Sequence, residues 1–306
     1  MMLPQRVKIV EVGARDGLQN ETRVLPVETR VELIRLLAEA GLTAIEAGSF
    51  VSAKRIPQMA GSGDVLQAAL AATADAGAAC AYPVLVPNLR GLEAAMQAGA
   101  TEIAVFAAAS ETFSRKNINC GIAESIERFA AVAERARAAN LRVRGYVSCA
   151  LGCPYQGEVG PGEVARVAGL LRDLGCHQIS LGDTIGVGTP GQARAMVERV
   201  AERVPVEHLA AHFHDTYGQA LANIHTVLPL GVSVLDSAIA GLGGCPFAAG
   251  ASGNVATEDV VYMLDGMGIH SGVDMRKLLF AGDYICAKLG RPNQSRAAAA
   301  LSARSR

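Results

Sequence analysis

Eight short runs rich in β-branched and apolar residues alternate along this chain with longer stretches rich in Ala, Leu, Glu and Arg. The strand-like runs cover residues 7–13, 43–47, 81–87, 102–107, 142–148, 178–181, 207–213 and 233–238. The helical stretches cover residues 27–40, 64–76, 88–98, 123–139, 161–174, 190–204 and 217–230, and glycines at 41, 99, 175 and 231 are expected to end four of them. Strands that alternate regularly with helices are typical of a parallel sheet. The sequence therefore predicts an α/β fold.

Two parallel architectures compete, an open doubly wound sheet and a closed (β/α)₈ barrel, the TIM barrel. A doubly wound sheet usually carries a Gly-x-Gly-x-x-Gly turn after its first strand, but here that strand leads into Gly-Ala-Arg-Asp-Gly at residues 13–17. Eight units spread over about 250 residues fit the closed barrel. We therefore expect residues 1–306 to form one domain, with the barrel at about 7–240 and extra C-terminal helices within about 241–290.

The composition excludes several classes of protein. Hydrophobic residues make up 50% of the chain and charged residues 19%, so the chain has ample material for a core and is not disordered. The formal net charge of −1 gives no sign of a nucleic-acid or membrane surface. The seven cysteines include no Cys-x-x-Cys pair, which argues against a structural zinc site. With no apolar run of about 20 residues and no leader-like N-terminus, we expect a cytoplasmic protein.

Charged and polar residues gather where the expected strands end. In a TIM barrel, chemistry is carried out at the carboxyl ends of the strands, where the following loops meet. The residues expected at this rim are Glu11, Arg15 and Asp16 after the first strand, Glu46 after the second, Arg144, Tyr146 and Ser148 on the fifth, Ser180 and Asp183 on the sixth, His212 and His214 on the seventh, and Cys245 and Asn254 beyond the eighth. Their concentration at one rim predicts an active site.

The sharpest local feature is His212-Phe213-His214. Residues two apart on a strand point to the same face, so both imidazoles can reach one ion. A carboxylate from a neighbouring strand end, such as Asp16, would complete a nitrogen and oxygen site that suits Mg²⁺, Mn²⁺ or Zn²⁺. The alternative is two histidines satisfied by hydrogen bonds alone. Acidic residues on the neighbouring strands favour the metal site.

Arg15 and Asp16 follow the first strand directly. A solvated ion pair in a turn is the simpler interpretation, but the apolar strand before them places the pair at the rim of the core. Arg15 is then able to stabilise an oxyanion that forms on a bound substrate.

Residues 241–254 are rich in glycine and contain Cys245. Such a segment could be a flexible linker, but it lacks a linker's serine repeats, and a mobile active-site lid explains it better. Asn254 is expected to begin a helix that has Glu258 and Asp259 in its first turn. Residues 110–117 offer Arg115 and Lys116 to an anionic cofactor tail, although a solvated loop explains them equally well.

Taken together, these segments closely resemble the 3-hydroxy-3-methylglutaryl-CoA (HMG-CoA) lyase family, in a bacterial form. The stretches that carry the resemblance are residues 7–21, 110–120, 144–155, 179–189, 212–223 and 245–254. The Arg15-Asp16 element alone would indicate only a wider superfamily of Claisen-condensing barrels, which includes isopropylmalate and homocitrate synthases. The Cys245 segment narrows the resemblance to the lyases.

The resemblance implies a metal-dependent retro-Claisen cleavage of HMG-CoA to acetyl-CoA and acetoacetate. It implies Mg²⁺ or Mn²⁺ held by Asp16, His212, His214 and Asn254. Arg15 would stabilise the enolate, Cys245 would be the catalytic residue of the mobile segment, and Asp16 or His212 would be the base. Glu46 and Asp183 would support proton transfer or orient the substrate, and substrate contacts would come from Arg15, Gln19, Asn117, Arg144, Tyr146 and Ser180. We also expect a homodimer that binds a small acyl-CoA and neither nucleic acid nor membrane.

Four residues at three sites depart from the family pattern. Ala14 replaces a usual Pro, Phe213 replaces a common Cys, and Ala47-Gly48 replaces a Thr-Thr or Thr-Ser pair beside Glu46. The last change is expected to widen the pocket near the acyl group, so a related 3-hydroxy-3-alkylglutaryl-CoA is an alternative substrate. A Claisen-type synthase acting on a 2-oxo acid and a metal-stabilised barrel without turnover are the rival hypotheses.

Overall fold

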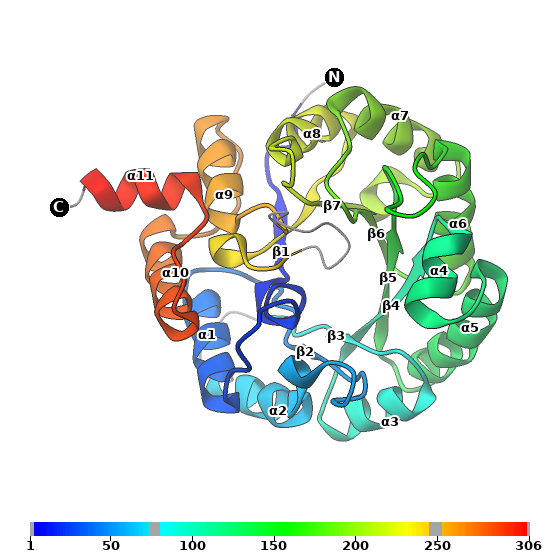
Figure 1. The fold of residues 1–306 in the computed structure, drawn as a ribbon, viewed down its shortest axis with the longest axis horizontal. Coiled ribbons are helices and arrows are strands. Elements are labelled where there is room, and N and C mark those ends of the chain that lie inside the picture. Colours follow the sequence, from blue (N-terminus) through cyan, green and yellow to red (C-terminus); the bar gives the residue numbers. More distant parts are fainter. Residues whose placement is uncertain (1–2, 74–79, 245–252, 305–306) are drawn as a thin grey trace.

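Eight parallel strands form the centre of the molecule in the computed structural model, which describes residues 3–73, 80–244 and 253–304. The strands are β1 (Lys8–Glu11), β2 (Gly48–Ser49), β3 (Val84–Leu85), β4 (Glu102–Ala108), β5 (Arg142–Ser148), β6 (Gln178–Asp183), β7 (Leu209–Phe213) and β8 (Val234–Ser237). Their order is β1-β8-β7-β6-β5-β4-β3-β2. The ring closes because the backbone of Glu11 donates to Ala44 and accepts from Glu46, at 2.9 and 2.8 Å. The predicted closed barrel is confirmed (Figure 1).

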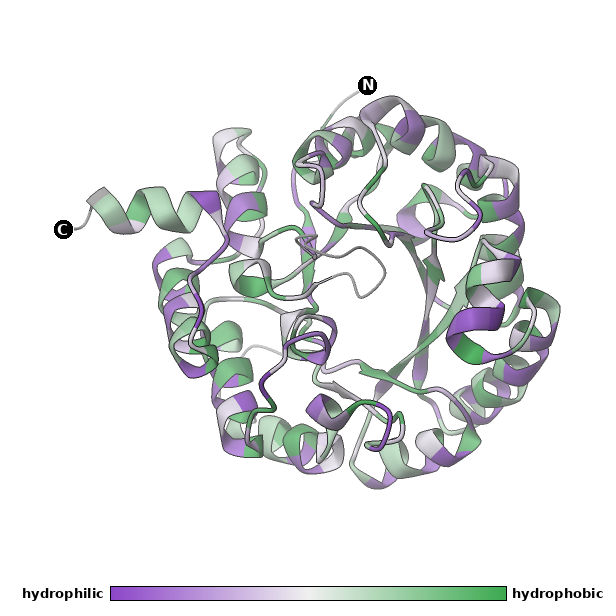
Figure 2. Ribbon diagram, viewed as in Figure 1, coloured by the Kyte–Doolittle hydropathy of each residue, from purple (hydrophilic) through white to green (hydrophobic). Residues whose placement is uncertain are grey.

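An outer ring of helices surrounds the strands (Figure 1). It consists of α1 (Val27–Glu39), α2 (Ser62–Thr73), α3 (Leu89–Gln97), α5 (Ile122–Ala138), α6 (Pro161–Asp173), α7 (Pro190–Ala201) and α8 (Ala220–Val227). These helices alternate between hydrophilic and hydrophobic residues along their length (Figure 2). In α1, for example, Leu33, Ile34 and Leu37 are fully buried, and the first two lie four and three residues before Leu37. This spacing places them on one face, which packs against the sheet.

Some elements differ from the sequence-based expectation. The segment after β4 is a helix, α4 (Glu111–Ile118), whose first turn is capped by the Ser110 hydroxyl accepting from the Phe113 amide at 3.1 Å. The helix expected from Asn254 begins three residues later, as α9 (Thr257–Gly266), because Asn254 lies in a bridge with His214 instead. The second strand-like run pairs through single bridges at Ala44 and Ile45.

Two further helices follow α9. They are α10 (Met275–Leu289) and α11 (Arg296–Arg304), so helical structure continues past the expected limit near residue 290. In Figure 1, α11 extends sideways from the barrel beside α9. Among the helices within the described ranges, none combines the length and apolar character that a membrane span requires.

Candidate active site

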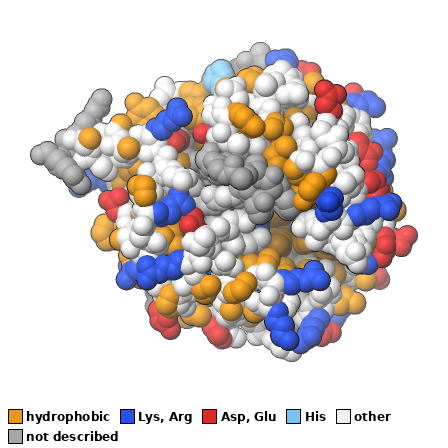
Figure 3. Space-filling model, in the orientation of Figure 1, with side chains coloured by type: hydrophobic (Ala, Val, Ile, Leu, Met, Phe, Trp, Pro, Cys, Tyr) orange, Lys and Arg blue, Asp and Glu red, His pale blue; other side chains and the backbone are white. Residues whose placement is uncertain are grey.

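A cavity of about 400 Å³ opens at the carboxyl ends of the strands. The space-filling view shows this face hollowed near its centre, with hydrophobic side chains in part of the hollow (Figure 3). The predicted site residues that line the cavity are Arg15, Asp16, Gln19, Asn117, Tyr146, Ser148, His212 and His214. Residues far apart in the sequence therefore meet at one rim, as the strand-end pattern predicts.

A tight turn directly after β1 places Arg15 and Asp16 in the cavity. Residues Gly13–Gly17 form one π-helical turn, and the amide of Gly13 donates to the Glu11 carboxylate at 2.8 Å. A side chain at position 13 would meet that carboxylate, because a Cβ built there lies 2.5 Å from Glu11 Oε1. Glycine is therefore required for the turn to fold back on the end of the strand.

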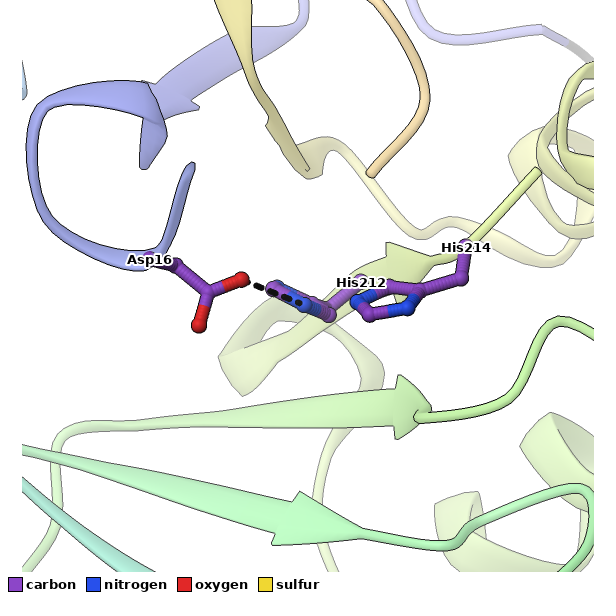
Figure 4. Close-up of side chains that lie close together, drawn as sticks. All are labelled: Asp16, His212 and His214. Carbon is purple, nitrogen blue, oxygen red and sulfur yellow. Dashed lines mark ion pairs between the residues drawn. The ribbon is translucent and has the colours of Figure 1, made fainter. Parts of the chain in front are cut away.

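Asp16, His212 and His214 form a compact cluster in the cavity. Each offers one ligand atom, and these atoms lie within 4.8 Å of one another. Figure 4 shows Asp16 approaching from the turn after β1 and both histidines from the end of β7, with Asp16 Oδ2 lying 4.0 Å from His212 Nε2. Asn254, the fourth predicted ligand, donates to Asp16 Oδ2 at 2.8 Å.

This donor set fits a divalent cation. His214 Nδ1 is buried and has no hydrogen-bond partner in the part of the chain that the structure describes. A buried polar atom without a partner is costly, and a metal ion would satisfy it. Two imidazoles and one carboxylate with an adjacent amide are suitable ligands for Mg²⁺, Mn²⁺ or Zn²⁺.

The protonation states also favour metal binding. Burial alone would raise the pKa of Asp16, but the charges of Arg15, His212 and His214 and the hydrogen bond from Asn254 lower it to about 2. Burial, reinforced by His212, lowers the pKa of His214 to about 4. At neutral pH, Asp16 is therefore a carboxylate and His214 a neutral imidazole with a free lone pair.

Arg15 is held between two carboxylates. Its guanidinium contacts Asp16 Oδ1 at 2.8 Å and Glu46 Oε2 at 2.7 Å, and it is only 6% exposed. Burial would lower the pKa of Arg15, but the charges of Glu46 and Asp16 raise it, so the side chain stays cationic. Tyr146 completes this side of the cavity, since its hydroxyl donates to Glu46 Oε1 at 3.2 Å. A fixed positive charge therefore lies beside the metal-binding cluster.

Besides Glu11 and Asn254, four predicted site residues are not among the described residues that line the cavity. Glu46 lies behind Arg15, and burial raises its pKa. Asp183 accepts from the backbone amides of Val187 and Gly188 at 3.2 and 2.8 Å. The other two, Arg144 and Ser180, are hydrogen bonded to Asp236.

Asp236 was missed by the sequence analysis. Its carboxylate contacts His212 Nδ1 at 3.2 Å and is almost fully buried. A signal was present, because Asp236 is a charged residue inside the expected strand at 233–238. A carboxylate in a buried strand needs a partner, and that requirement would have marked it.

Two other expectations concern the surroundings of the cavity. Ala47 and Gly48 do not widen it as expected, because the open side of Gly48 faces Ser62, whose Oγ lies 2.6 Å from a Cβ built there. Lys116 lies over the ring of Tyr155 at 4.7 Å, outside the set of described lining residues. Cys245 lies outside the residues that the structure describes, and Gly244 before it lines the cavity.

Comparisons with known proteins agree with this arrangement. Residues 6–285 match the HMGL-like family. Mitochondrial hydroxymethylglutaryl-CoA lyase of Rattus norvegicus is 59% identical over 298 residues, which cover 97% of this chain and 90% of the relative. The 3-hydroxy-3-isohexenylglutaryl-CoA/hydroxy-methylglutaryl-CoA lyase of Pseudomonas aeruginosa is 57% identical over 304 residues, covering 99% of this chain and 100% of the relative.

Solved structures lead to the same result. The crystal structure of hydroxymethylglutaryl-CoA lyase from Pseudomonas aeruginosa superposes with a TM-score of 0.95 at 57% identity, covering 99% of this chain and 100% of that one. An HMG-CoA lyase from Acinetobacter baumannii, in complex with coenzyme A and 3-methylmalate, has a TM-score of 0.89 at 34% identity, with 98% and 96% coverage. The family resemblance in the sequence is thereby confirmed, and this chain belongs to the HMGL-like family.

Proposed function

We propose that this protein cleaves (S)-3-hydroxy-3-methylglutaryl-CoA to acetyl-CoA and acetoacetate. The observation that carries the proposal is the Asp16, His212 and His214 cluster beside the buried guanidinium of Arg15, in one cavity. Relatives that are 57% and 59% identical over nearly the whole chain carry the name of this lyase. The fold, the candidate metal ligands and the sequence similarity therefore all support a carbon–carbon lyase activity.

The cluster would hold Mg²⁺ or Mn²⁺ through Asp16, His212 and His214, with Asn254 as a fourth ligand. When bound, such an ion lowers the pKa of a coordinated substrate hydroxyl and offsets carboxylate charge. Three carboxylates (Asp16, Glu46 and Asp236) and two guanidiniums (Arg15 and Arg144) give this region a formal charge of −1. A cation is therefore electrostatically favoured there.

The chain's own groups then account for the bond cleavage. Asp16 takes the proton of the tertiary hydroxyl, whose oxygen becomes the ketone oxygen of acetoacetate. His212, the other candidate base, has Nδ1 turned to Asp236 and Nε2 turned to the metal-binding cluster, which leaves it no free lone pair. The electron pair of the adjacent carbon–carbon bond passes to the carbon next to the thioester and forms an enolate. Arg15 stabilises the enolate oxygen, because its charge is already fixed in the cavity. Cys245 supplies the proton that converts the enolate to acetyl-CoA.

Among the proposed substrate contacts, Gln19, Asn117 and Tyr146 lie on the cavity wall. Gln19 Oε1 is buried and without a partner in the described structure, so it is available to accept from a substrate. Direct contacts from Arg144 and Ser180 stay predictions, because both donate to Asp236. Glu46 and Asp183 would act through the residues and backbone that they hold.

An assay for acetoacetate tests the proposal. The full chain is incubated with HMG-CoA and either Mg²⁺ or Mn²⁺, and we expect acetoacetate release that EDTA abolishes. A parallel assay supplies acetyl-CoA with 2-oxo acids. Consumption of acetyl-CoA there, with no acetoacetate from HMG-CoA, would favour a synthase. An effect of EDTA on the melting temperature without cleavage of any CoA thioester would favour a metal-stabilised barrel without turnover.

A longer 3-alkyl branch on the substrate is a second candidate. Apolar side chains line one part of the cavity, namely those of Val51, Ile56, Leu85, Pro87 and Phe106. The name of the Pseudomonas aeruginosa relative includes a 3-isohexenyl substrate. This apolar wall is able to bury an alkyl chain. Comparing kcat/KM for HMG-CoA and a 3-hydroxy-3-isohexenylglutaryl thioester tests the idea, and cleavage of HMG-CoA alone would exclude it.

We further propose that residues 1–306 act as one lyase domain in a cytoplasmic homodimer. Contacts of Glu11 with the Ile239 amide and the Thr257 hydroxyl support the single domain, because they join the first strand to the C-terminal helices. Resemblance to the family supports the dimer. Analytical ultracentrifugation of the full chain would show a monomer if the dimer proposal is wrong.

A further inference from the structure

The carboxylate of Asp236 lies beneath His212, on the inner side of β8. It is 1% exposed. Arg144 donates to both of its oxygens, with Nη2 at 2.6 Å from Oδ1 and Nη1 at 3.1 Å from Oδ2. Ser180 Oγ donates to Oδ2 at 2.8 Å, and His212 Nδ1 lies 3.2 Å from the same oxygen. Every contact in this group is therefore made to a carboxylate that is sealed from solvent.

These contacts determine which nitrogen of His212 carries the proton. Arg144 donates to both oxygens of Asp236 and Ser180 donates to one of them, so these donors hold the group as an ionised carboxylate. An ionised carboxylate can only accept hydrogen bonds. His212 Nδ1 must therefore carry the hydrogen, and in the neutral ring Nε2 is left with its lone pair. Nε2 is the atom that lies 4.0 Å from Asp16 Oδ2.

We propose that Asp236 is a positioning residue for the metal site, which fixes the ring of His212 so that Nε2 faces Asp16 and His214. The inference rests on the proposed function only in taking Nε2 as a metal ligand. Carboxylates that orient a ligating histidine in this way fix its tautomer and raise its basicity.

Arg144 and Ser180 have a defined place in this arrangement. Arg144 is itself held by Gln178 Oε1 at 2.9 Å and by the Tyr146 hydroxyl at 2.7 Å. Because β5, β6 and β8 supply these groups, the position of Asp236 is set by the barrel itself and not by a loop. Rigid strand positions hold a ligand more accurately than loops do. Both residues would thus act on the metal site through Asp236.

The tautomer of His212 is the first test. Nitrogen-15 spectra of the metal-free full chain are recorded well above the ordinary histidine pKa of about 6.5, so that the rings are neutral. The His212 signals are those that disappear in His212→Gln. We expect protonated Nδ1 and bare Nε2. Protonated Nε2 in the wild-type protein would overturn the proposal, whatever the variants do.

Affinity for Mn²⁺ is the second test, measured by titration calorimetry without substrate. Asp236→Asn should raise the Kd for Mn²⁺ about 10- to 100-fold, which is the usual effect of losing such a partner. Glu102→Gln is the matched control, because Glu102 also pairs with a histidine, His177, at 3.5 Å. Glu102 lies at the amino end of β4, away from the cavity at the carboxyl ends of the strands. We expect no change in Kd for this control. A folded Asp236→Asn protein with a Kd within about twofold of wild type contradicts the proposal.

Failure of the positioning role is distinguishable from failure of the lyase function. Both tests read the metal-free protein or Mn²⁺ binding, and neither needs HMG-CoA. A chain that binds Mn²⁺ with the expected tautomer but releases no acetoacetate would retain the role of Asp236 and lose the proposed reaction. Cleavage of HMG-CoA by a wild-type protein with protonated His212 Nε2 would support the proposed reaction and exclude the positioning role of Asp236.

Discussion

At the scale of single residues, the main feature is the preorganised charge of Arg15. Its guanidinium is bound by Asp16 and Glu46 and stacks within 5.6 Å of the Tyr146 ring centre. A side chain held this firmly needs no reorganisation when negative charge develops on the substrate. Fixed positive charge in a partly dry site stabilises an oxyanion far more than it would in water.

Replacing Arg15 should therefore affect the chemical step. We expect Arg15→Gln to lower kcat about 10²- to 10³-fold, as removal of an oxyanion donor does in other enzymes. Steady-state kinetics with HMG-CoA would measure this. Arg35→Gln is the control, because Arg35 pairs with Glu32 and Glu39 on the outer side of α1. A wild-type kcat for Arg15→Gln would remove Arg15 from the mechanism.

Cys245 carries the second prediction at this scale. Since a serine hydroxyl is a much weaker acid than a thiol, Cys245→Ser should lose about 10²- to 10⁴-fold in kcat, the usual contribution of a proton donor. Binding of Mn²⁺ should be unchanged, because Cys245 is not a proposed ligand. Turnover at the wild-type rate would mean that another group protonates the enolate.

At the scale of elements, helix ends are defined by local side-chain contacts. Helix α10 begins at Met275, and the residue before it, Asp274, caps it: Asp274 Oδ1 accepts from the amides of Arg276 and Lys277 at 2.9 and 3.2 Å. It ends at Leu289 and is followed by the C-cap Gly290, which has a φ of 74°. The first amides of a helix lack partners within the helix, so an acceptor at the cap stabilises it.

Loss of this cap should cost stability and leave activity unchanged. Asp274→Ala is expected to lower the free energy of unfolding by about 1 kcal/mol. Urea denaturation followed by circular dichroism would measure the change. Asp274→Asn is the matched control, because the amide oxygen still accepts from the same amides. Equal losses in both variants would show that the cap is not the cause.

At the scale of the whole molecule, Glu11 joins the first strand of the barrel to the segments that follow the last strand. Its Oε1 accepts from the Gly13 and Ile239 amides at 2.8 Å each, and its Oε2 accepts from the Thr257 hydroxyl at 2.6 Å. Burial raises the pKa of Glu11 to about 7, although these hydrogen bonds lower it. This carboxyl is therefore more easily protonated in the folded chain than in the unfolded one.

The raised pKa predicts how stability depends on pH. The unfolded chain ionises this group near pH 4.5 and the folded chain near 7, so its contribution is complete below 4.5 and is lost as the pH rises through 7. Relative to Glu11→Gln, the wild type should lose on the order of 3 kcal/mol of unfolding free energy across this interval. Urea denaturation at several pH values would measure the difference. A difference independent of pH would contradict the raised pKa.

Much of the architecture could be predicted from local pattern. The glycines expected to end helices, at 41, 99, 175 and 231, all have positive φ. Two features were predicted less accurately: the strand pairing of residues 43–47 and the helix α4. The first makes only single bridges. The helix α4 depends on its cap Ser110, which is hydrogen bonded to Cys153 and Gln156. These partners lie more than 40 residues away in the sequence, so the contacts form only in the tertiary structure.

The sequence by itself determined the barrel and the Asp16, His212 and His214 cluster. Both follow from short-range periodicity, because alternate residues of a strand share a face and parallel strands end at one rim. Only the tertiary structure decided which buried residues, Asp236 and Arg144, support that cluster. Asp236 meets Arg144 across 92 positions and His212 across 24, and the burial of the three depends on closure of the whole ring. Such pairings are chosen by the need of a buried charge for a partner, which no local pattern specifies.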